Sequence, residues 1–216
     1  MTFETVWAVY YSGTGTTRRV LQTMAVAAGE ALGIPVRELD YTLPERREKR
    51  NTFCEKDLIF WGSPTYAGRL PNVLLPFLRQ NFSGGGAAAA AVVLYGNRSY
   101  DDALKELCEV LAADGFLPAA AAALVGEHAF APLLAHGRPA AADLAAAGDF
   151  ARRTALALRE IKRPQPVKVP GREPIGAYYT PLMPNGEPAR FLKAKPVTDS
   201  ASCTRCGLCA ARCPMG

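Results

Sequence analysis

Short apolar runs alternate along the chain with longer segments in which apolar residues recur at helical spacing. The apolar runs predict strands at about 3–11, 35–39, 57–62, 87–95 and 116–125, and the other segments predict helices at about 18–32, 44–50, 71–80, 101–114 and 140–162. Alternation of this kind favours an α/β fold in which helical crossovers join parallel strands. We therefore expect a doubly wound parallel sheet of five strands.

The loop after the first predicted strand is suited to holding an anion. It reads Ser12-Gly13-Thr14-Gly15-Thr16-Thr17 and leads directly into a helix. The first N–H groups of a helix lack intrahelical partners and carry partial positive charge, while the hydroxyls add further donors. The loop lacks the lysine of a Walker motif and the third glycine of a Rossmann fingerprint. Taken alone, it is also compatible with a Ser/Thr-rich turn that holds no ligand.

Two further loops follow the third and fourth predicted strands, and they contain residues that suit a flat heteroaromatic ring. In a doubly wound sheet, ligands bind outside the carboxyl ends of the strands, near the point where the strand order reverses. In the loop 63–69, Tyr66 offers a stacking surface, and its neighbours Ala67 and Gly68 allow close backbone approach. In the loop 96–100, the first two residues offer hydrogen bonds and Tyr100 a second ring face.

The stretches 12–17, 62–69 and 96–100 resemble the three FMN loops of the flavodoxin superfamily. Nearly the whole chain also resembles the flavodoxin–ferredoxin fusion proteins, the EFR-type "ferrodoxin" family. The resemblance implies the strand order 2-1-3-4-5, FMN as a cofactor, and a charge from Arg98 near the pyrimidine edge of the flavin. The FMN-binding residues that it implies are Ser12, Gly13, Thr14, Gly15, Thr16, Thr17, Pro64, Thr65, Tyr66, Ala67, Gly68, Gly96, Asn97, Arg98 and Tyr100.

Four cysteines near the end of the sequence form the pattern C-x2-C-x2-C-x3-C-P. They are Cys203, Cys206, Cys209 and Cys213. This spacing is typical of bacterial [4Fe–4S] ligation, whereas zinc ligands come in separated pairs. In two-cluster ferredoxins the fourth cysteine serves a second cluster, and no second run follows here, so we expect a cluster site that is incomplete in a truncated chain. A single cluster held by all four thiolates is the alternative. The other two cysteines, Cys54 and Cys108, are expected to be small buried apolar residues.

Proline density marks a connector between the two parts of the chain. Eight of the 17 prolines fall between Pro164 and Pro196, which disfavours helices and strands. We therefore divide the sequence into a flavodoxin-like FMN-binding domain (1–163), a Pro-rich linker (164–200) and a partial [4Fe–4S] ferredoxin-type segment (201–216).

Composition and charge indicate where the protein is located and what kind of partner it binds. No apolar stretch is long enough to span a bilayer and Met1 leads almost directly into a strand, so we expect a cytoplasmic protein without a signal peptide. The net charge of +5 belongs to the last part of the chain, because residues from Arg159 onward hold ten Lys/Arg and four Asp/Glu. No nucleic-acid-binding motif accompanies this charge, so it suits an acidic redox partner and not nucleic acid.

These features together predict an electron-transfer flavoprotein that passes electrons between FMN and a 4Fe-4S centre. A flavin can take two electrons and release them singly, and an iron–sulfur cluster passes one at a time. The partner would be a redox protein or a small-molecule electron acceptor. One alternative is an FMN-dependent reductase of a quinone or other small substrate, fed by the iron–sulfur module. Another is a flavodoxin-shaped binding module without a cofactor.

Overall fold

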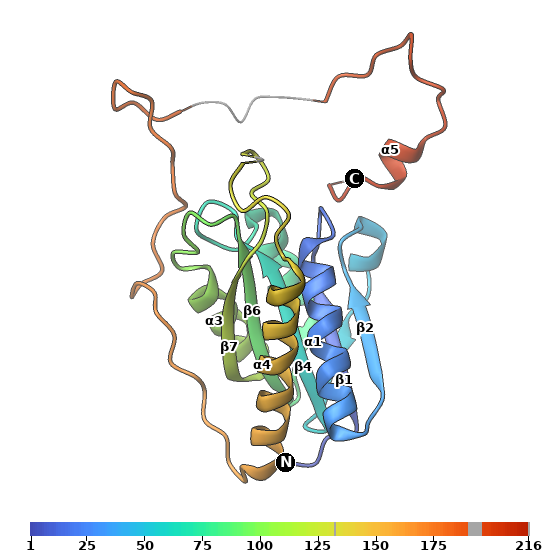
Figure 1. Cartoon of the computed structure of the whole chain (residues 1–216), viewed down its shortest axis with the longest axis vertical. Helices are drawn as coiled ribbons and strands as arrows, with labels where there is room; N and C mark the ends of the chain where they lie inside the picture. The colour runs from blue at the N-terminus through green and yellow to red at the C-terminus, as the bar shows by residue number, and fades with distance from the viewer. Residues whose placement is uncertain (132, 190–195, 216) are drawn as a thin grey trace.

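A parallel sheet of five strands forms the centre of the molecule in the computed structural model, which describes residues 1–131, 133–189 and 196–215 (Figure 1). The strands are β1 (Thr5–Tyr10), β2 (Val36–Asp40), β4 (Asp57–Pro64), β6 (Ala88–Tyr95) and β7 (Leu117–Val125). Their order is β2-β1-β4-β6-β7, and every neighbouring pair is parallel. The predicted α/β fold with a five-stranded parallel sheet is confirmed. The order reverses direction between β1 and β4.

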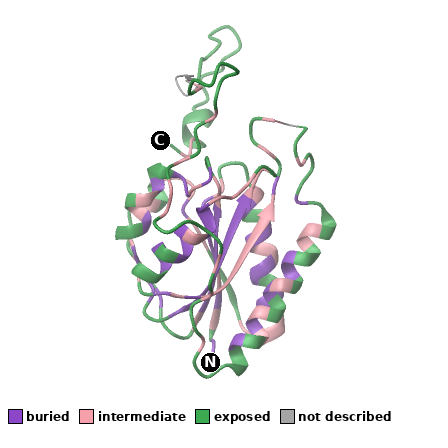
Figure 2. Ribbon diagram, turned by 90° about the vertical axis from the view of Figure 1, so that its left-hand side faces the viewer, coloured by how far each residue is buried: buried purple, intermediate pink, exposed green. Residues whose placement is uncertain are grey.

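Helices cover both faces of this sheet. The principal helices are α1 (Thr16–Leu32), α2 (Leu75–Gln80), α3 (Ala103–Ala113) and α4 (Ala141–Glu160). The buried side chains of α1 and α4 pack on one face, and those of α2 and α3 pack on the other. Figure 2 shows the buried strands enclosed between these two helical layers.

Five short elements complete the described secondary structure. Two 3-10 helices, η1 (Pro44–Arg47) and η2 (Asn72–Leu74), stand where the sequence predicted helices at 44–50 and at the start of 71–80. The strands β3 (Asn51–Thr52) and β5 (Phe82–Ser83) pair with each other in a small parallel sheet. A last helix, α5 (Leu208–Ala211), lies within the cysteine run.

The core is built from small residues on the central strands and aromatic rings around them. The Ala88–Ala91 stretch of β6 is fully buried and lets helices on both faces approach closely. On the α2/α3 face, Trp61 packs against Phe82 with ring centroids 4.6 Å apart, and its Nε1–H donates to the hydroxyl of Tyr41 at 3.0 Å. Complete burial raises the pKa of Tyr41. Each such buried ring contributes about 2 kcal/mol of apolar transfer free energy, and the hydrogen bond satisfies its polar atoms.

The Pro-rich segment runs along the outer edge of the sheet. This segment, coloured orange in Figure 1, runs from the end of α4 along β7 to the carboxyl ends of the strands. The Val167 N–H donates to the carbonyl of Pro118 at 2.8 Å, and the side chains of Val167 and Val169 pack on the core. Between 164 and 189 the structure has no helix and no strand beyond one isolated bridge, Leu182 with Pro188. The rest of the predicted linker includes 190–195, which lies outside the described residues.

The residue that ends α3, Asp114, is an ionisable group in an unfavourable place. Its Oδ2 is buried with no hydrogen-bond partner among the described residues, and burial raises its pKa to about 6. Between the ordinary carboxyl pKa and this value the folded state binds more protons, so stability falls as the pH rises through that range.

We expect Asp114→Asn to raise the free energy of unfolding at pH 7 by about 1 kcal/mol, because the amide carries no charge into the buried position. At pH 4 the carboxyl of the folded wild type is protonated and most of the gain disappears. Denaturant unfolding of both proteins at the two pH values measures the difference. An equal gain at both values would contradict the ionisation argument.

Candidate functional site

The first predicted loop turns from β1 into α1, and Ser12 fixes its backbone. The Ser12 N–H donates to Thr42 Oγ1 at 2.9 Å, and Ser12 Oγ accepts the N–H of Arg18 at 3.0 Å. Gly15 precedes the helix at φ +86°, in the left-handed region that favours glycine. Gly15 has no side chain to cap the helix, so the side-chain acceptor at this end is Ser12 Oγ. The start of α1 therefore keeps donors that the loop itself does not use.

These donors are backbone N–H groups at the positive end of a 17-residue helix. Within the described residues, the N–H groups of Thr14, Thr16 and Thr17 have no acceptor at hydrogen-bond distance. The hydroxyls of Thr14 and Thr16 lie 3.4 Å apart, and residues 13–15 are exposed. The loop is a solvent-accessible cradle of neutral donors, which is the chemistry that a phosphate monoester requires.

The second loop leaves the end of β4 and contains an unsatisfied hydroxyl. The Thr65 N–H donates to the carbonyl of Leu94 at 2.7 Å, which ties the loop to β6. The Thr65 Oγ1 is buried without a hydrogen-bond partner among the described residues. A buried hydroxyl left unpaired costs about 1–3 kcal/mol, so a ligand atom that bonded it would gain that energy.

Tyr66 links the second loop to the first. Tyr66 is 44% exposed, and its hydroxyl lies 3.6 Å from the position that a Cβ on Gly13 would take. Partial burial and the neighbouring Tyr11 phenol raise the pKa of Tyr66. The ring is thus held beside the cradle with part of its surface open.

The second loop then makes a tight turn against the third. The turn is closed by reciprocal hydrogen bonds between Tyr66 and Arg69, at 2.9 and 3.1 Å. The two residues inside it, Ala67 and Gly68, have φ of +50° and +78°. A Cβ on Gly68 would lie 2.2 Å from Asp101 Oδ2, so a side chain larger than hydrogen does not fit.

The third loop follows β6. Three of its residues that were predicted to contact the flavin ring, Asn97, Arg98 and Tyr100, have different surroundings. Asn97 is exposed at φ +62°. Arg98 forms an ion pair with Asp101, and its guanidinium lies 4.1 Å from the ring centroid of Tyr179. Tyr100 is half-buried and packs edge-on against Tyr95, with ring centroids 5.4 Å apart. The Arg98 charge therefore already has a carboxylate partner, and the Tyr100 ring is engaged in packing.

A fourth loop, which follows β7, lies against the first and third loops. A Cβ on Gly126 would lie 2.9 Å from Thr16 Cγ2, and a Cβ on Gly96 would lie 2.5 Å from His128 Cδ2. His128 Nδ1 accepts the N–H groups of Phe130 and Ala131, both at 3.1 Å, so this ring stabilises its own turn. All three predicted loops thus lie at the carboxyl edge of the sheet, next to the reversal between β1 and β4.

Several residues that shape these loops were not predicted from the sequence. Asp101 and Asp102 contact the second loop from the start of α3, and Tyr179 reaches the site from the Pro-rich segment. The adjacent acidic pair Asp101-Asp102 and the adjacent tyrosines Tyr178-Tyr179 were visible in the sequence. Neither pair matched a motif, so nothing local connected them to a site.

The four cysteines of the terminal run do not form a ligand cluster in the structure. Within 1–131, 133–189 and 196–215, no three His, Cys, Asp or Glu side chains converge on one point as metal ligands would. Cys203, Cys206 and Cys209 are exposed. The backbone of the run nevertheless suits thiolates, because the Arg205 N–H donates to Cys203 Sγ at 3.4 Å and the Leu208 N–H lowers the pKa of Cys206. The donor chemistry fits a metal cluster, but the described geometry does not assemble one.

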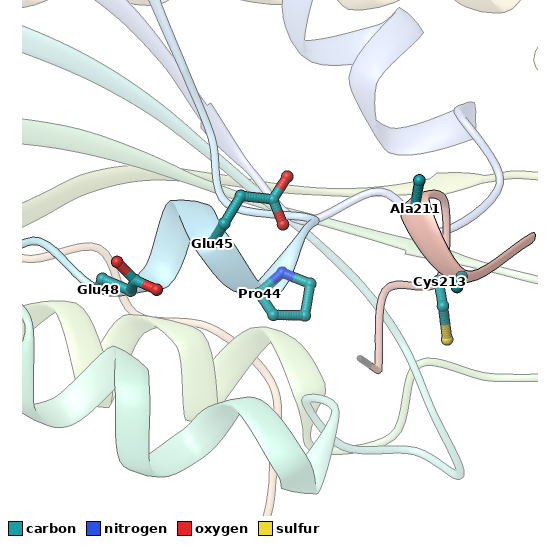
Figure 3. Close-up of a pocket in the computed structure, with 6 residues that line it drawn as sticks. Pro44, Glu45, Glu48, Ala211 and Cys213 are labelled. Carbon is teal, nitrogen blue, oxygen red and sulfur yellow. The ribbon is translucent and has the colours of Figure 1, made fainter. Parts of the chain in front are cut away.

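The cysteine run approaches the domain at η1, which follows β2 at the same edge of the sheet. Figure 3 shows a hollow between them, with Pro44, Glu45 and Glu48 on one side and Ala211 and Cys213 on the other. The guanidinium of Arg47 donates to the carbonyl of Pro214 at 2.7 Å. Its charge also lies 5.7 Å from the ring centroid of Tyr11.

The two remaining cysteines differ from each other. Cys108 is buried, and burial raises its pKa to about 11. Cys54 is exposed, so the prediction that it would be buried is wrong. Its position at the turn after β3 explains the error, because the backbone N–H of Cys54 bonds Asp57 Oδ2 at 3.0 Å while its side chain faces solvent. No described helix is long and apolar enough to cross a membrane.

Comparison with known proteins gives similarity to solved structures only. No family model matches the chain, and no curated protein matches it. It is similar to a flavodoxin from the domain Archaea at 14% identity, covering 72% of this chain and 99% of the other, with a TM-score of 0.46. It is similar to an azoreductase from Bacillus anthracis at 14% identity, covering 71% and 99%, with a TM-score of 0.48. It is similar to the Flv1 flavodiiron core of Synechocystis at 18% identity, covering 73% of this chain but only 36% of that one, with a TM-score of 0.48.

Proposed function

We propose that this chain is an FMN-binding electron-transfer flavoprotein. The observation that carries the proposal is the meeting of three loops at one edge of the sheet, where two kinds of polar group have no hydrogen-bond partner in the part of the chain that the structure describes. These are the N–H groups of Thr14, Thr16 and Thr17 and the buried hydroxyl of Thr65. An anion would accept hydrogen bonds from the three N–H groups, and a second polar group would bond the Thr65 hydroxyl. FMN carries an anionic phosphate and further hydrogen-bonding groups in one molecule.

The first loop would hold the phosphate of FMN. Residues Ser12, Gly13, Thr14, Gly15, Thr16 and Thr17 would surround it with backbone N–H groups, hydroxyls and the positive end of α1. No lysine or arginine is required, because several neutral donors share the charge.

The second and third loops would hold the ring system. Residues Pro64, Thr65, Tyr66, Ala67 and Gly68 would present a stacking surface and close backbone, and Gly96, Asn97, Arg98 and Tyr100 would border the pyrimidine side. When bound, FMN would supply redox chemistry in steps of one or two electrons. The pairing of Arg98 with Asp101 lowers the net positive charge that this loop offers.

We further propose that four thiolates bind a 4Fe-4S cluster, those of Cys203, Cys206, Cys209 and Cys213. The spacing of the run and the N–H groups that bond Cys203 and Cys206 support this proposal. Residues 1–163 would form the flavin domain, 164–200 the connector and 201–216 the ferredoxin-type segment. The physiological partner would be a redox protein or a small electron acceptor. Partial exposure of Tyr66 leaves room for the alternative, a reductase of a small substrate, and steady-state turnover of a quinone would favour it.

Flavin titration of the apoprotein tests the cofactor and the phosphate loop together. We expect FMN to bind with quenching of its fluorescence, and Thr14→Val to raise the Kd for FMN about tenfold because one hydroxyl donor to a charged group is lost. Riboflavin has no phosphate, so its Kd should not change. Thr23→Val is the matched control, since that hydroxyl lies further along α1 and bonds the carbonyl of Arg19 at 2.9 Å. A protein that does not quench FMN fluorescence would overturn the proposal.

A further inference from the structure

The Pro-rich segment makes its most specific contacts with the loops of the candidate flavin site. We call residues 164–180 the strap. At its far end the Tyr179 N–H donates to the carbonyl of Ala67 at 2.7 Å, inside the second loop. The Tyr178 hydroxyl donates to the carbonyl of Leu70 at 2.8 Å. The strap therefore ends on the backbone that would approach the flavin ring.

A buried carboxylate holds the middle of the strap. Asp102 is 2% exposed, and its oxygens accept the N–H of Arg172 at 2.9 Å, the N–H of Gly176 at 2.8 Å and the guanidinium Nε of Arg172 at 2.9 Å. Burial alone would raise the pKa of Asp102, but these hydrogen bonds outweigh it and the pKa lies below its usual value. All three donors come from the strap, so without the strap the Asp102 carboxylate would have no hydrogen-bond donor among the described residues.

A second anchor runs through Arg69, the residue that closes the turn of the second loop. Its guanidinium pairs with Glu106, whose side chain is 3% exposed, and also donates to the carbonyl of Gly176. The same guanidinium lies 4.9 Å from the ring centroid of Tyr178. One arginine thus joins α3, the second loop and the strap.

The strap also sets the position of the charge in the third loop. The Arg98 guanidinium lies 4.1 Å from the ring centroid of Tyr179, which belongs to the strap. Asp101, which precedes α3, forms an ion pair with the same guanidinium. A cation held against an aromatic ring at this distance is attracted to the negative face of the ring. Without Tyr179, one of the two groups that orient Arg98 is lost.

We infer that the strap is a structural part of the flavin site, with Asp102 as the positioning residue that holds it against the second and third loops. The inference rests on the proposed function and adds a coupling to it. Binding of FMN and docking of the strap should favour each other, and thermodynamic linkage requires the two effects to be equal in size. A connector that merely joined two modules would show no such coupling.

Variants of the 216-residue chain test the coupling. Asp102→Asn keeps the shape but removes the charge, and Arg172→Met removes one donor from a largely exposed side chain, which keeps the test valid if the first variant folds poorly. Asp149→Asn is the control, because it removes an exposed carboxylate on α4, which packs on the other face of the sheet, and this carboxylate pairs with Arg152 instead of the strap. Amide hydrogen exchange at Gly176 and Tyr179, measured first without flavin and then with FMN, reports strap docking, and the Kd for FMN reports the site.

We expect Asp102→Asn to speed exchange at both amides and to raise the Kd for FMN about tenfold, with a smaller change of the same sign in Arg172→Met. FMN should slow strap exchange in the wild type. Tyr179→Ala should shift the midpoint potential of bound FMN while leaving exchange at Gly176 unchanged, an effect that a merely structural role would not produce. A freed strap with wild-type FMN affinity, or a strap that stays docked in Asp102→Asn, would overturn the inference. A wild-type chain that binds no FMN would overturn the proposed function and the strap's role with it.

Discussion

Replacement of Gly68 by alanine is expected to abolish tight FMN binding. Gly68 has φ +78°, which costs a non-glycine residue about 1–2 kcal/mol, and its Cβ would lie 2.2 Å from Asp101 Oδ2 and 2.8 Å from Asp101 Cβ. Overpacking of this kind costs about 1–3 kcal/mol more. The Gly68 carbonyl also accepts the N–H of Asp102 at 3.0 Å, so a shift here moves the start of α3 as well.

We therefore expect the Kd for FMN to rise by at least about a hundredfold in Gly68→Ala, measured by fluorescence titration. The matched control is Gly33→Ala, which has a similar φ of +68° but no atom within 4 Å of the added Cβ. It lies at the opposite end of α1 and should lower stability by about 1 kcal/mol without changing FMN affinity. Equal FMN affinity in both variants would show that the contact between the second and third loops has no part in the site.

The strands and the crossover helices were predictable because each is a local pattern. The run Asp57–Gly62 is apolar almost throughout and forms a fully enclosed strand, and Val20, Met24 and Ala28 recur at helical spacing on the buried face of α1. The strands β3 and β5 were missed because two residues carry no periodicity. They pair because the fold brings Asn51 and Phe82 side by side, and these residues are far apart in the sequence.

The site was predictable to the extent that it is made of loops that follow strands. Topology alone places the loops after β1, β4 and β6 at one edge. The contacts that fix these loops join residues far apart in the sequence, such as Arg172 with Asp102 and Tyr179 with Ala67. Proline density disfavours helix and strand, but it does not reveal whether a segment packs, because packing depends on acceptors located elsewhere in the fold.

Replacement of the four cysteines of the terminal run is expected to abolish iron and sulfide binding. After anaerobic reconstitution with iron and sulfide, we expect the full-length chain to retain iron and acid-labile sulfide with a broad visible absorption band. The variant with serine at Cys203, Cys206, Cys209 and Cys213 should retain neither, because a hydroxyl is a poor ligand for an iron–sulfur cluster compared with thiolate. Cys54→Ser is the control, since its thiol is also exposed but stands apart from the run. Zinc retention without sulfide would support a zinc site, and retention of iron by the serine variant would contradict both assignments.

Metal loading should also change the conformation of the run. The described thiols do not converge, so cluster assembly has to reorganise residues 203–213. Arg205 and Arg212 are exposed, so we expect trypsin to cut the metal-free chain after both. Metal binding is coupled to folding of the segment, so the loaded segment should resist this cleavage. Equal cleavage rates before and after reconstitution would mean that iron is bound without ordering the run. Since Arg47 contacts Pro214 beside η1, an ordered run would lie at the same edge of the sheet as the proposed flavin, as electron transfer between the two centres requires.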